Sequence, residues 1–211
     1  MSNSSLVNYT KLSPNYSTRP GKISKITIHH MAGNLSVEAC GNVFAPTSRQ
    51  ASSNYGIGSD GRIGMYVEEK HRAWTSSNRA NDEVAVTIEV ANDGGAPNWH
   101  VSDKALAALI DLCVDICKRN GIAKLNWTGT ASGNLTIHKF FAATSCPGPY
   151  LESKMGYIAE QVNKRLAPTT TTTNNSGATL YRVQVGAFKN KSNADALLKR
   201  LKAAGFDGYI K

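Results

Sequence analysis

Acidic side chains are scarce in this chain. Its 211 residues include 24 lysines and arginines but only 15 aspartates and glutamates, which gives a formal net charge of +9. A protein of this charge is drawn to polyanions, among them nucleic acids and anionic cell envelopes. The sequence holds no recognised nucleic-acid motif and no dense lysine or arginine run, so nucleic-acid binding is the weaker alternative.

Long apolar runs are also missing. No stretch approaches the roughly 20 residues that span a bilayer. The first residues, Met1–Ser5, are polar and lack the charged start and apolar core of a secretory signal. We therefore expect a protein that spans no membrane and accumulates in the cytoplasm of the cell that makes it. Action outside that cell would need another exit route.

Only four cysteines occur, and the missing signal favours reduced thiols over disulfides. Cys113 and Cys117 lie four residues apart in a leucine-rich segment, which places both on the apolar face of a helix. We interpret them, and Cys40, as structural. Cys146 differs because it precedes a Pro-Gly-Pro turn.

The composition changes abruptly near residue 167. A threonine-rich stretch without charges follows, and it cannot bury enough apolar surface to fold. We interpret residues 167–179 as a linker between a large unit, residues 1–166, and a small unit, residues 180–211.

The large unit alternates strand and helix patterns. Strands are predicted at 22–30, 54–58, 63–67, 84–91 and 134–137, and helices at 103–120 and 149–166. Asp60 and Gly61 form the turn of a hairpin, and Ser102 and Gly121 suit the two ends of the longer predicted helix. The apolar run at 84–91 is typical of a central strand. These patterns predict an α/β unit with a mixed sheet.

The small unit predicts a βαβ fragment. A strand is expected at 180–188, a helix capped by Ser192 at 193–204, and a second strand from residue 206. A unit of this size is too small to be stable by itself.

Two histidine-bearing segments and one cysteine suggest a metal site. His138 and Cys146, set against the adjacent pair His29 and His30, offer soft nitrogen and sulfur ligands that suit zinc. Three protein ligands leave one position for water, which indicates hydrolysis. Neighbouring residues of a strand point to opposite faces, so only one histidine of the pair faces such a site. The His-x7-Cys spacing is not a standard metal motif, so unrelated polar residues are the alternative.

Two further residues are candidates for chemistry. Glu89 interrupts an apolar strand, where a carboxylate without a partner is costly. Beside a metal it would serve as general base or orient a water, while an exposed face or an ion pair is the alternative. The hydroxyl of Tyr55 suits a developing oxyanion, although packing in the core is the commoner role of such a tyrosine.

Five motifs, taken in order, resemble one family. Ile26–His30, Asn54–Gly61, Val86–Glu89, His138 and Thr144–Gly148 are similar to the motifs of zinc-dependent N-acetylmuramoyl-L-alanine amidases. This amidase-2 group includes phage lysozyme-type amidases and peptidoglycan-recognition proteins. The resemblance covers about residues 20–166 and implies a central mixed sheet flanked by helices, with a zinc cleft on one face.

The resemblance also implies residue roles. It makes His29, His138 and Cys146 the ligands of Zn²⁺, with His30 on the opposite face of the strand. It matches Glu89 to a catalytic base and Tyr55 to an active-site tyrosine. Thr144 stands where the family carries lysine or threonine and would orient the substrate carbonyl or water.

Outside these motifs, three residues in loop segments are expected either to line the glycopeptide groove or to pack on the surface: Arg72, Trp74 and Asn92. Residues 181–201 resemble the first half of a sporulation-related (SPOR) repeat, a family that binds bacterial glycan strands.

The predicted function is zinc-dependent hydrolysis of the amide bond between N-acetylmuramic acid and L-alanine in peptidoglycan, which lyses the wall. The expected partners are peptidoglycan and anionic wall polymers. A phage endolysin that waits in the host cytoplasm fits the domain order. A bacterial autolysin or spore-cortex amidase, and a peptidoglycan-binding module without activity, are the alternatives.

Overall fold

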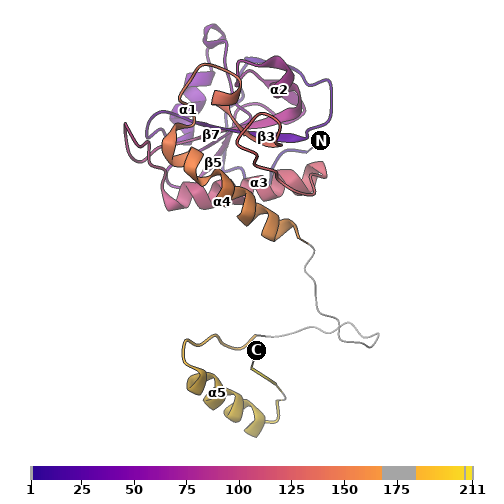
Figure 1. Ribbon diagram of the computed structural model, residues 1–211, viewed down its shortest axis with the longest axis vertical. Helices are drawn as coiled ribbons and strands as arrows, with labels where there is room; N and C mark the ends of the chain where they lie inside the picture. Colours follow the sequence, from indigo (N-terminus) through magenta and orange to yellow (C-terminus); the bar gives the residue numbers. More distant parts are fainter. Residues whose placement is uncertain (1, 168–183, 207, 211) are drawn as a thin grey trace. The chain divides into compact units, whose positions relative to one another are not determined.

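Two parallel strands, β3 (Lys25–His30) and β7 (Ala85–Val90), form the centre of a six-stranded sheet (Figure 1). The computed structural model describes residues 2–167, 184–206 and 208–210. The chain forms two compact units, Met1–Thr169 and Thr170–Lys211. Apart from Ala167, the predicted linker lies outside the described residues.

The sheet is mixed, as the sequence predicts. Its order is β1-β5-β4-β7-β3-β8, and only the β4–β5 hairpin is antiparallel. The other four strands of this sheet are β1 (Tyr9–Thr10), β4 (Tyr55–Ile57), β5 (Ile63–Met65) and β8 (Leu135–Ile137). A separate pair joins β2 (Tyr16–Thr18) to β6 (His71–Ala73). The predicted Asp60–Gly61 turn is confirmed: Gly61 has φ 86°, and Arg62 N–H donates to Asp60 Oδ1 at 3.0 Å.

The helices of the large unit divide between the two faces of the sheet (Figure 1). They are α1 (Val37–Phe44), α2 (Arg79–Val84), α3 (Asp103–Asn120) and α4 (Gly148–Leu166), with short 3₁₀ turns η1 (Thr47–Arg49) and η2 (His138–Phe140). Both predicted ends of α3 are confirmed. Ser102 Oγ accepts from the Ala105 N–H at 3.1 Å, and Gly121 closes the helix at φ 69°.

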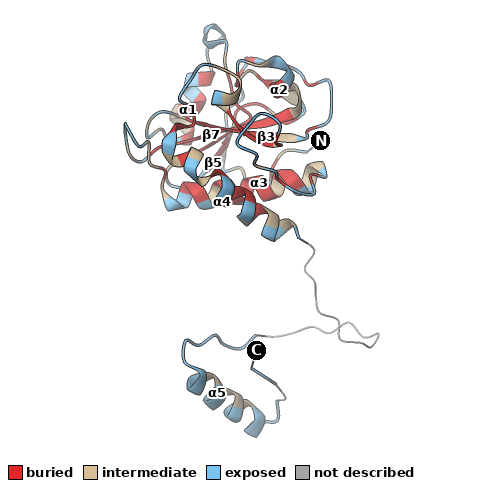
Figure 2. Ribbon diagram, viewed as in Figure 1, coloured by how far each residue is buried: buried red, intermediate tan, exposed pale blue. Residues whose placement is uncertain are grey.

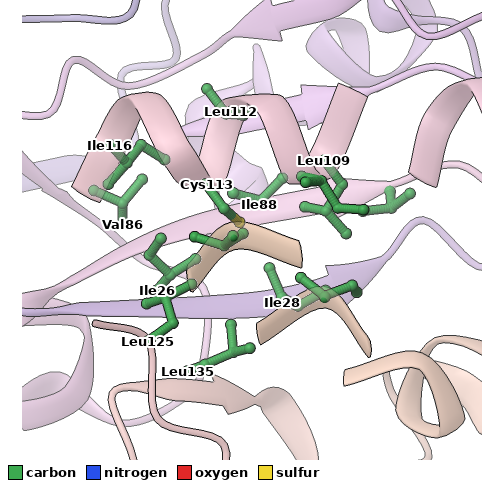
Figure 3. Packing of buried hydrophobic residues seen from close by; sticks show 14 of the residues in the cluster. Ile26, Ile28, Val86, Ile88, Leu109, Leu112, Cys113, Ile116, Leu125 and Leu135 are labelled. Carbon is green, nitrogen blue, oxygen red and sulfur yellow. The ribbon is translucent and has the colours of Figure 1, made fainter. Parts of the chain in front are cut away.

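One face of the sheet carries the main core. Ile28 on β3, Ile88 on β7 and Ile137 on β8 are fully buried and aligned in register. Figure 3 shows these strands packed under α3, whose buried side recurs every three or four residues and includes Leu109, Leu112, Cys113 and Ile116. Cys113 and Cys117 are therefore structural, as predicted.

The opposite face has smaller residues in its outer part. Gly56 and Gly64 lie under the ring of Tyr66, and a Cβ atom at Gly56 would lie 2.8 Å from the Tyr66 hydroxyl. That hydroxyl donates to the Val37 carbonyl at 2.8 Å, which fixes the start of α1 on this face. Cys40 and Phe44 of α1 pack against the same ring. The missing side chains of Gly56 and Gly64 therefore leave room for the Tyr66 ring, and α1 packs on that ring beside the central strands.

The small unit contains α5 (Lys191–Ala203), which confirms the predicted helix. The helix follows Asn190, so the prediction of Ser192 as cap is wrong. The predicted strands are also wrong for the described residues 184–188, 206 and 208–210, which contain none. A strand needs a partner to satisfy its backbone groups. Figure 2 shows that α5 has no buried residue.

Among the helices of the described residues, none is both long and apolar enough to cross a bilayer.

Candidate metal centre

His29, His138 and Cys146 converge at one edge of the sheet. Their ligand atoms all lie within 4.8 Å of one another, and the two imidazole rings are 4.5 Å apart between centroids. His29 lies near the end of β3, and His138 follows the last residue of β8. The carboxyl ends of parallel strands are the usual place for ligand sites in open α/β sheets.

The strand register explains why these side chains meet. Ile137 pairs with Ile28, so the residues that follow them, His138 and His29, come to the face opposite the core. Glu89 pairs directly with His29 and shares that face. The loop after His138 returns to the sheet through the Lys139 N–H, which donates to the Cys146 carbonyl at 3.1 Å.

The donor set fits zinc. Nε2 of His29 and Nε2 of His138 are both buried without a hydrogen-bond partner among the described residues. Burial lowers the pKa of His29 well below its ordinary value, so the ring is neutral and available as a ligand. Burial raises the pKa of the Cys146 thiol, so a thiolate there needs a cation. Neutral imidazole and thiolate are zinc's preferred ligands.

His30 supports this set without facing it. Its backbone N–H donates to Cys146 Sγ at 3.4 Å, which stabilises a thiolate. Its ring turns to the other side and packs edge-on against Trp99 at 5.3 Å. The two adjacent histidines thus take opposite faces, as the strand alternation predicts.

Glu89 has the environment of a proton carrier. Its Oε2 is covered and has no hydrogen-bond partner among the described residues. Burial raises the pKa of Glu89 from 4.5 to about 8, although the positive charge of Arg49 acts in the other direction. A carboxyl group with a pKa near neutrality can both take and return a proton.

Thr144 lies beside the cysteine ligand. Its Oγ1 accepts the Cys146 N–H at 3.2 Å, which orders the loop before the ligand. Thr144, Glu89, His138 and Cys146 all line one open hollow of about 380 Å³. The structure therefore brings together five of the six predicted site residues, the fifth being His29 beneath them.

Tyr55 is the exception, and its predicted place in the active site is wrong. It pairs with Ile88, so its side chain lies on the core face of the sheet. The hydroxyl donates to Glu69 Oε1 at 2.7 Å and accepts the Ser4 N–H at 3.0 Å. Glu69 also forms an ion pair with Arg119, whose Nη2 lies 2.6 Å from Glu69 Oε1. A residue one position away on β4 would have faced the metal ligands.

We expect Tyr55→Phe to destabilise the protein without reducing its catalytic rate. The change leaves the Ser4 N–H without its acceptor and removes one donor from a buried carboxylate, which costs about 1–3 kcal/mol. Thermal unfolding and the rate constant per folded molecule would be measured together. A large loss of rate with unchanged stability would restore Tyr55 to the active site.

The groove residues expected in loops lie elsewhere. Arg72 Nε and Trp74 Nε1 both donate to Ser17 Oγ on β2, at 2.8 and 3.3 Å. Asn92 is buried and donates to the Trp99 carbonyl at 2.8 Å. None of the three lines the hollow. Its wall is formed instead by α1, η1 and the loop before α1, including Val43, Phe44, Arg49 and, from that loop, Leu35.

Two known families have sequence models that match this chain. The sequence model of Amidase_2, described as N-acetylmuramoyl-L-alanine amidase, matches residues 19–149, more than half of the chain. The chain belongs to the N-acetylmuramoyl-L-alanine amidase family. The matched range includes all three candidate metal ligands and Glu89. A SPOR domain model matches residues 156–211, a range that starts within α4.

Individual known proteins are similar to this amidase-family chain in sequence or in fold. It is 34% identical over 116 residues to N-acetylmuramoyl-L-alanine amidase A of Achromobacter lyticus, covering 52% of this chain and 60% of that protein. The fold is similar to that of a selenomethionine AmpD derivative, with a TM-score of 0.56, 18% identity, and coverage of 77% and 95%. The amidase LysC of Clostridium intestinale URNW gives a TM-score of 0.51 at 22% identity, with coverage of 72% and 94%.

The buried carboxyl of this amidase-family protein predicts a pH effect on stability. In the metal-free protein, folding raises the pKa of Glu89 from 4.5 to about 8, so the folded state holds a proton that the unfolded state has lost. The free energy of unfolding should therefore fall as pH rises between these values, by a few kcal/mol. Burial also lowers the pKa of His29, His30 and His138. Below about pH 6.5 this effect makes the free energy of unfolding rise with pH, which opposes the effect of Glu89.

The difference between the wild type and Glu89→Gln isolates the carboxyl. Denaturant unfolding gives the free energy of unfolding of both metal-free proteins. Relative to that of the wild type, the value for the variant should increase from pH 4.5 to 8 and stay constant above pH 8. A difference that does not change with pH would contradict the burial of this group.

Proposed function

We propose that this protein is a zinc-dependent amidase that hydrolyses the bond between the lactyl group of N-acetylmuramic acid and L-alanine in peptidoglycan. One observation carries the proposal: three zinc-type ligands converge, and two of them, His138 and Cys146, line one open hollow together with the carboxylate of Glu89. His29, His138 and Cys146 would hold the ion. The family match supports the choice of bond.

Zinc bound there would act as a Lewis acid toward the amide carbonyl and lower the pKa of water. The chain itself supplies the proton transfers. Glu89 Oε2 accepts the proton of the attacking water and returns it to the nitrogen of the departing alanine. Burial raises the pKa of this carboxyl in the metal-free protein, and a zinc ion beside it would lower the pKa again, which leaves a carboxylate that can accept the proton near neutral pH. Thr144 lies at the mouth of the hollow and would position the substrate carbonyl.

A binding module without activity is the second candidate. The resemblance links loss of hydrolysis to loss of the cysteine ligand, and Cys146 is present here. This favours the enzyme. The SPOR match supports attachment of the small unit to glycan strands. Lysis of the wall by an endolysin, rather than by an autolysin or a spore-cortex amidase, stays a prediction.

The test is to incubate the full chain with purified peptidoglycan and to label the groups that are released. We expect new L-alanine amino termini, lost on chelation and restored by zinc. New reducing sugar ends would mean a glycosidase. Binding to the wall without any release would establish the recognition module instead.

A further inference from the structure

The small unit exposes an unusual number of large apolar side chains. None of its described residues, 184–206 and 208–210, is buried (Figure 2). Of the ten exposed large apolar side chains in the described chain, five belong to this unit: Val185, Phe188, Phe206, Tyr209 and Ile210. Their exposed fractions range from 40% to 68%. Exposed apolar side chains gathered in so short a segment indicate a binding surface.

The two segments that flank α5 lie against its leucines. A Cβ atom at Gly186 would lie 3.3 Å from Leu197 Cδ2, and one at Gly208 would lie 3.4 Å from Leu198 Cδ1. Both leucines are partly buried, whereas the large side chains of the flanking segments stay in water. Burying those side chains therefore requires a partner outside this unit.

The same unit is basic. Its described residues carry five cations and one anion, Asp195, whose Oδ2 lies 2.9 Å from Lys191 Nζ. The other four cations are exposed and have no acidic partner among the described residues: Lys189, Lys199, Arg200 and Lys202. Positions 191, 199 and 202 share one side of α5, because their spacing is close to whole turns. A partner of this surface is therefore negatively charged as well as apolar.

We propose that the small unit docks on the surface of a bilayer that contains anionic phospholipids. The lipid phosphates would pair with the four uncompensated cations, and the side chains of Phe188, Phe206 and Tyr209 would enter the boundary between headgroups and acyl chains. This binding goes beyond the proposed hydrolysis and does not depend on it.

Other partners match the surface less well. The domain match supports binding of this unit to glycan strands. A glycan strand offers hydroxyl groups and carboxylates, but it has no apolar layer in which five large side chains could be buried. A second copy of this chain would bring the same positive charge to the interface. An anionic bilayer supplies both the negative charge and the apolar layer.

Docking would also stabilise α5. This helix has 13 residues, and isolated helices of that length are marginal in water. Contact with the bilayer would withdraw the flanking apolar side chains from water and hold their segments on the helix. The amide hydrogens of the bound unit should therefore exchange more slowly than those of the free unit.

The test is co-sedimentation of the full chain with two kinds of vesicle, phosphatidylcholine alone or with phosphatidylglycerol added. Each basic residue near an anionic surface contributes about fivefold to the binding constant, so four of them should favour the anionic vesicles by about a hundredfold or more. Lys199→Gln combined with Lys202→Gln should weaken this binding by about twentyfold. Phe206→Ser should weaken it by about tenfold, because less apolar surface leaves water.

Matched variants in the large unit serve as controls. Lys118→Gln combined with Lys124→Gln makes the same change of charge at two exposed lysines. Tyr157→Ser removes an aromatic side chain of α4 that is 48% exposed. Both should bind anionic vesicles as the wild type does. Cys146→Ser should also bind them normally, because the docking surface takes no part in the amidase chemistry.

Hydrogen exchange locates the contact. Anionic vesicles should slow amide exchange in residues 184–206 and leave the large unit unchanged. Protection in the large unit alone, equal binding to the two kinds of vesicle, or wild-type binding by Phe206→Ser would overturn the inference.

Two other outcomes would assign the surface elsewhere. Binding to glycan strands without binding to either vesicle would give it to the glycan. Self-association that Phe206→Ser abolishes, again without binding to vesicles, would give it to a second copy of the chain. Both would overturn the inference and leave the amidase standing, since the release of L-alanine termini tests that function separately.

Discussion

Replacing Cys146 by serine is expected to remove bound zinc and reduce amidase activity by about a thousandfold or more. Zinc contributes several kcal/mol of transition-state stabilisation, and each 1.4 kcal/mol is a factor of ten in rate. A serine hydroxyl is a much poorer ligand than a thiolate. The serine Oγ would also replace the Cys146 Sγ that accepts the His30 N–H at the end of β3. Metal content and release of L-alanine termini would be measured on the same preparation.

Cys113→Ala is the matched control for this variant. Cys113 is another buried thiol, but it belongs to α3 and packs in the core on the opposite face of the sheet. Its loss should lower the free energy of unfolding and leave the zinc content at the wild-type level. If Cys146→Ser retained zinc and activity, the ligand assignment would be wrong. If the inactive Cys146→Ser variant still binds the wall, the substitution has removed the zinc ligand without unfolding the protein, as expected of an enzyme.

Glu89→Gln is expected to lower kcat by about a hundredfold to ten-thousandfold, the usual contribution of a general base. Glutamine keeps the shape of the side chain but cannot accept the proton of water. Zinc content should be unchanged, because Glu89 is not among the three clustered ligands. The comparison of kcat with metal content therefore separates a proton-transfer role from a ligand role.

The fitting control is Glu160→Gln, which neutralises an exposed carboxylate of α4 paired with Lys164. It should leave both kcat and zinc content unaffected. Loss of zinc from Glu89→Gln would make the carboxylate a fourth ligand and contradict the proposed base. An unchanged kcat would assign the proton transfers to another group.

The large unit could be predicted largely because its signals are local. Ser102 and Gly121 fix the ends of α3, and the apolar run before Val90 marks β7 as a central strand. Helix α1 was missed, although Val37, Cys40 and Phe44 have helical spacing after the cap Ser36. In the small unit the strand patterns were present, but none of the described residues there supplies a pairing strand.

Which side chains meet at the site depends on the pairing register of the strands, and the sequence predicts that register only in part. Strand alternation separates His29 from His30, but it does not say which strand lies beside β3. The pairing of Tyr55 with Ile88 decides its face, and no local pattern near Tyr55 predicts that pairing. Arg49 and the wall formed by α1 were missed for the same reason, because they reach the hollow through packing between distant segments.

The position of β8 in the sheet has a further consequence. This three-residue strand is the last in the order and pairs with β3 alone, so it is an outer strand with few backbone bonds. One metal ion bound by His29, His138 and Cys146 would cross-link the end of β8 to β3. Chelation would then free the strand and uncover the edge of β3, and exposed strand edges pair with other chains. Loss of zinc should appear as aggregation before it appears as unfolding.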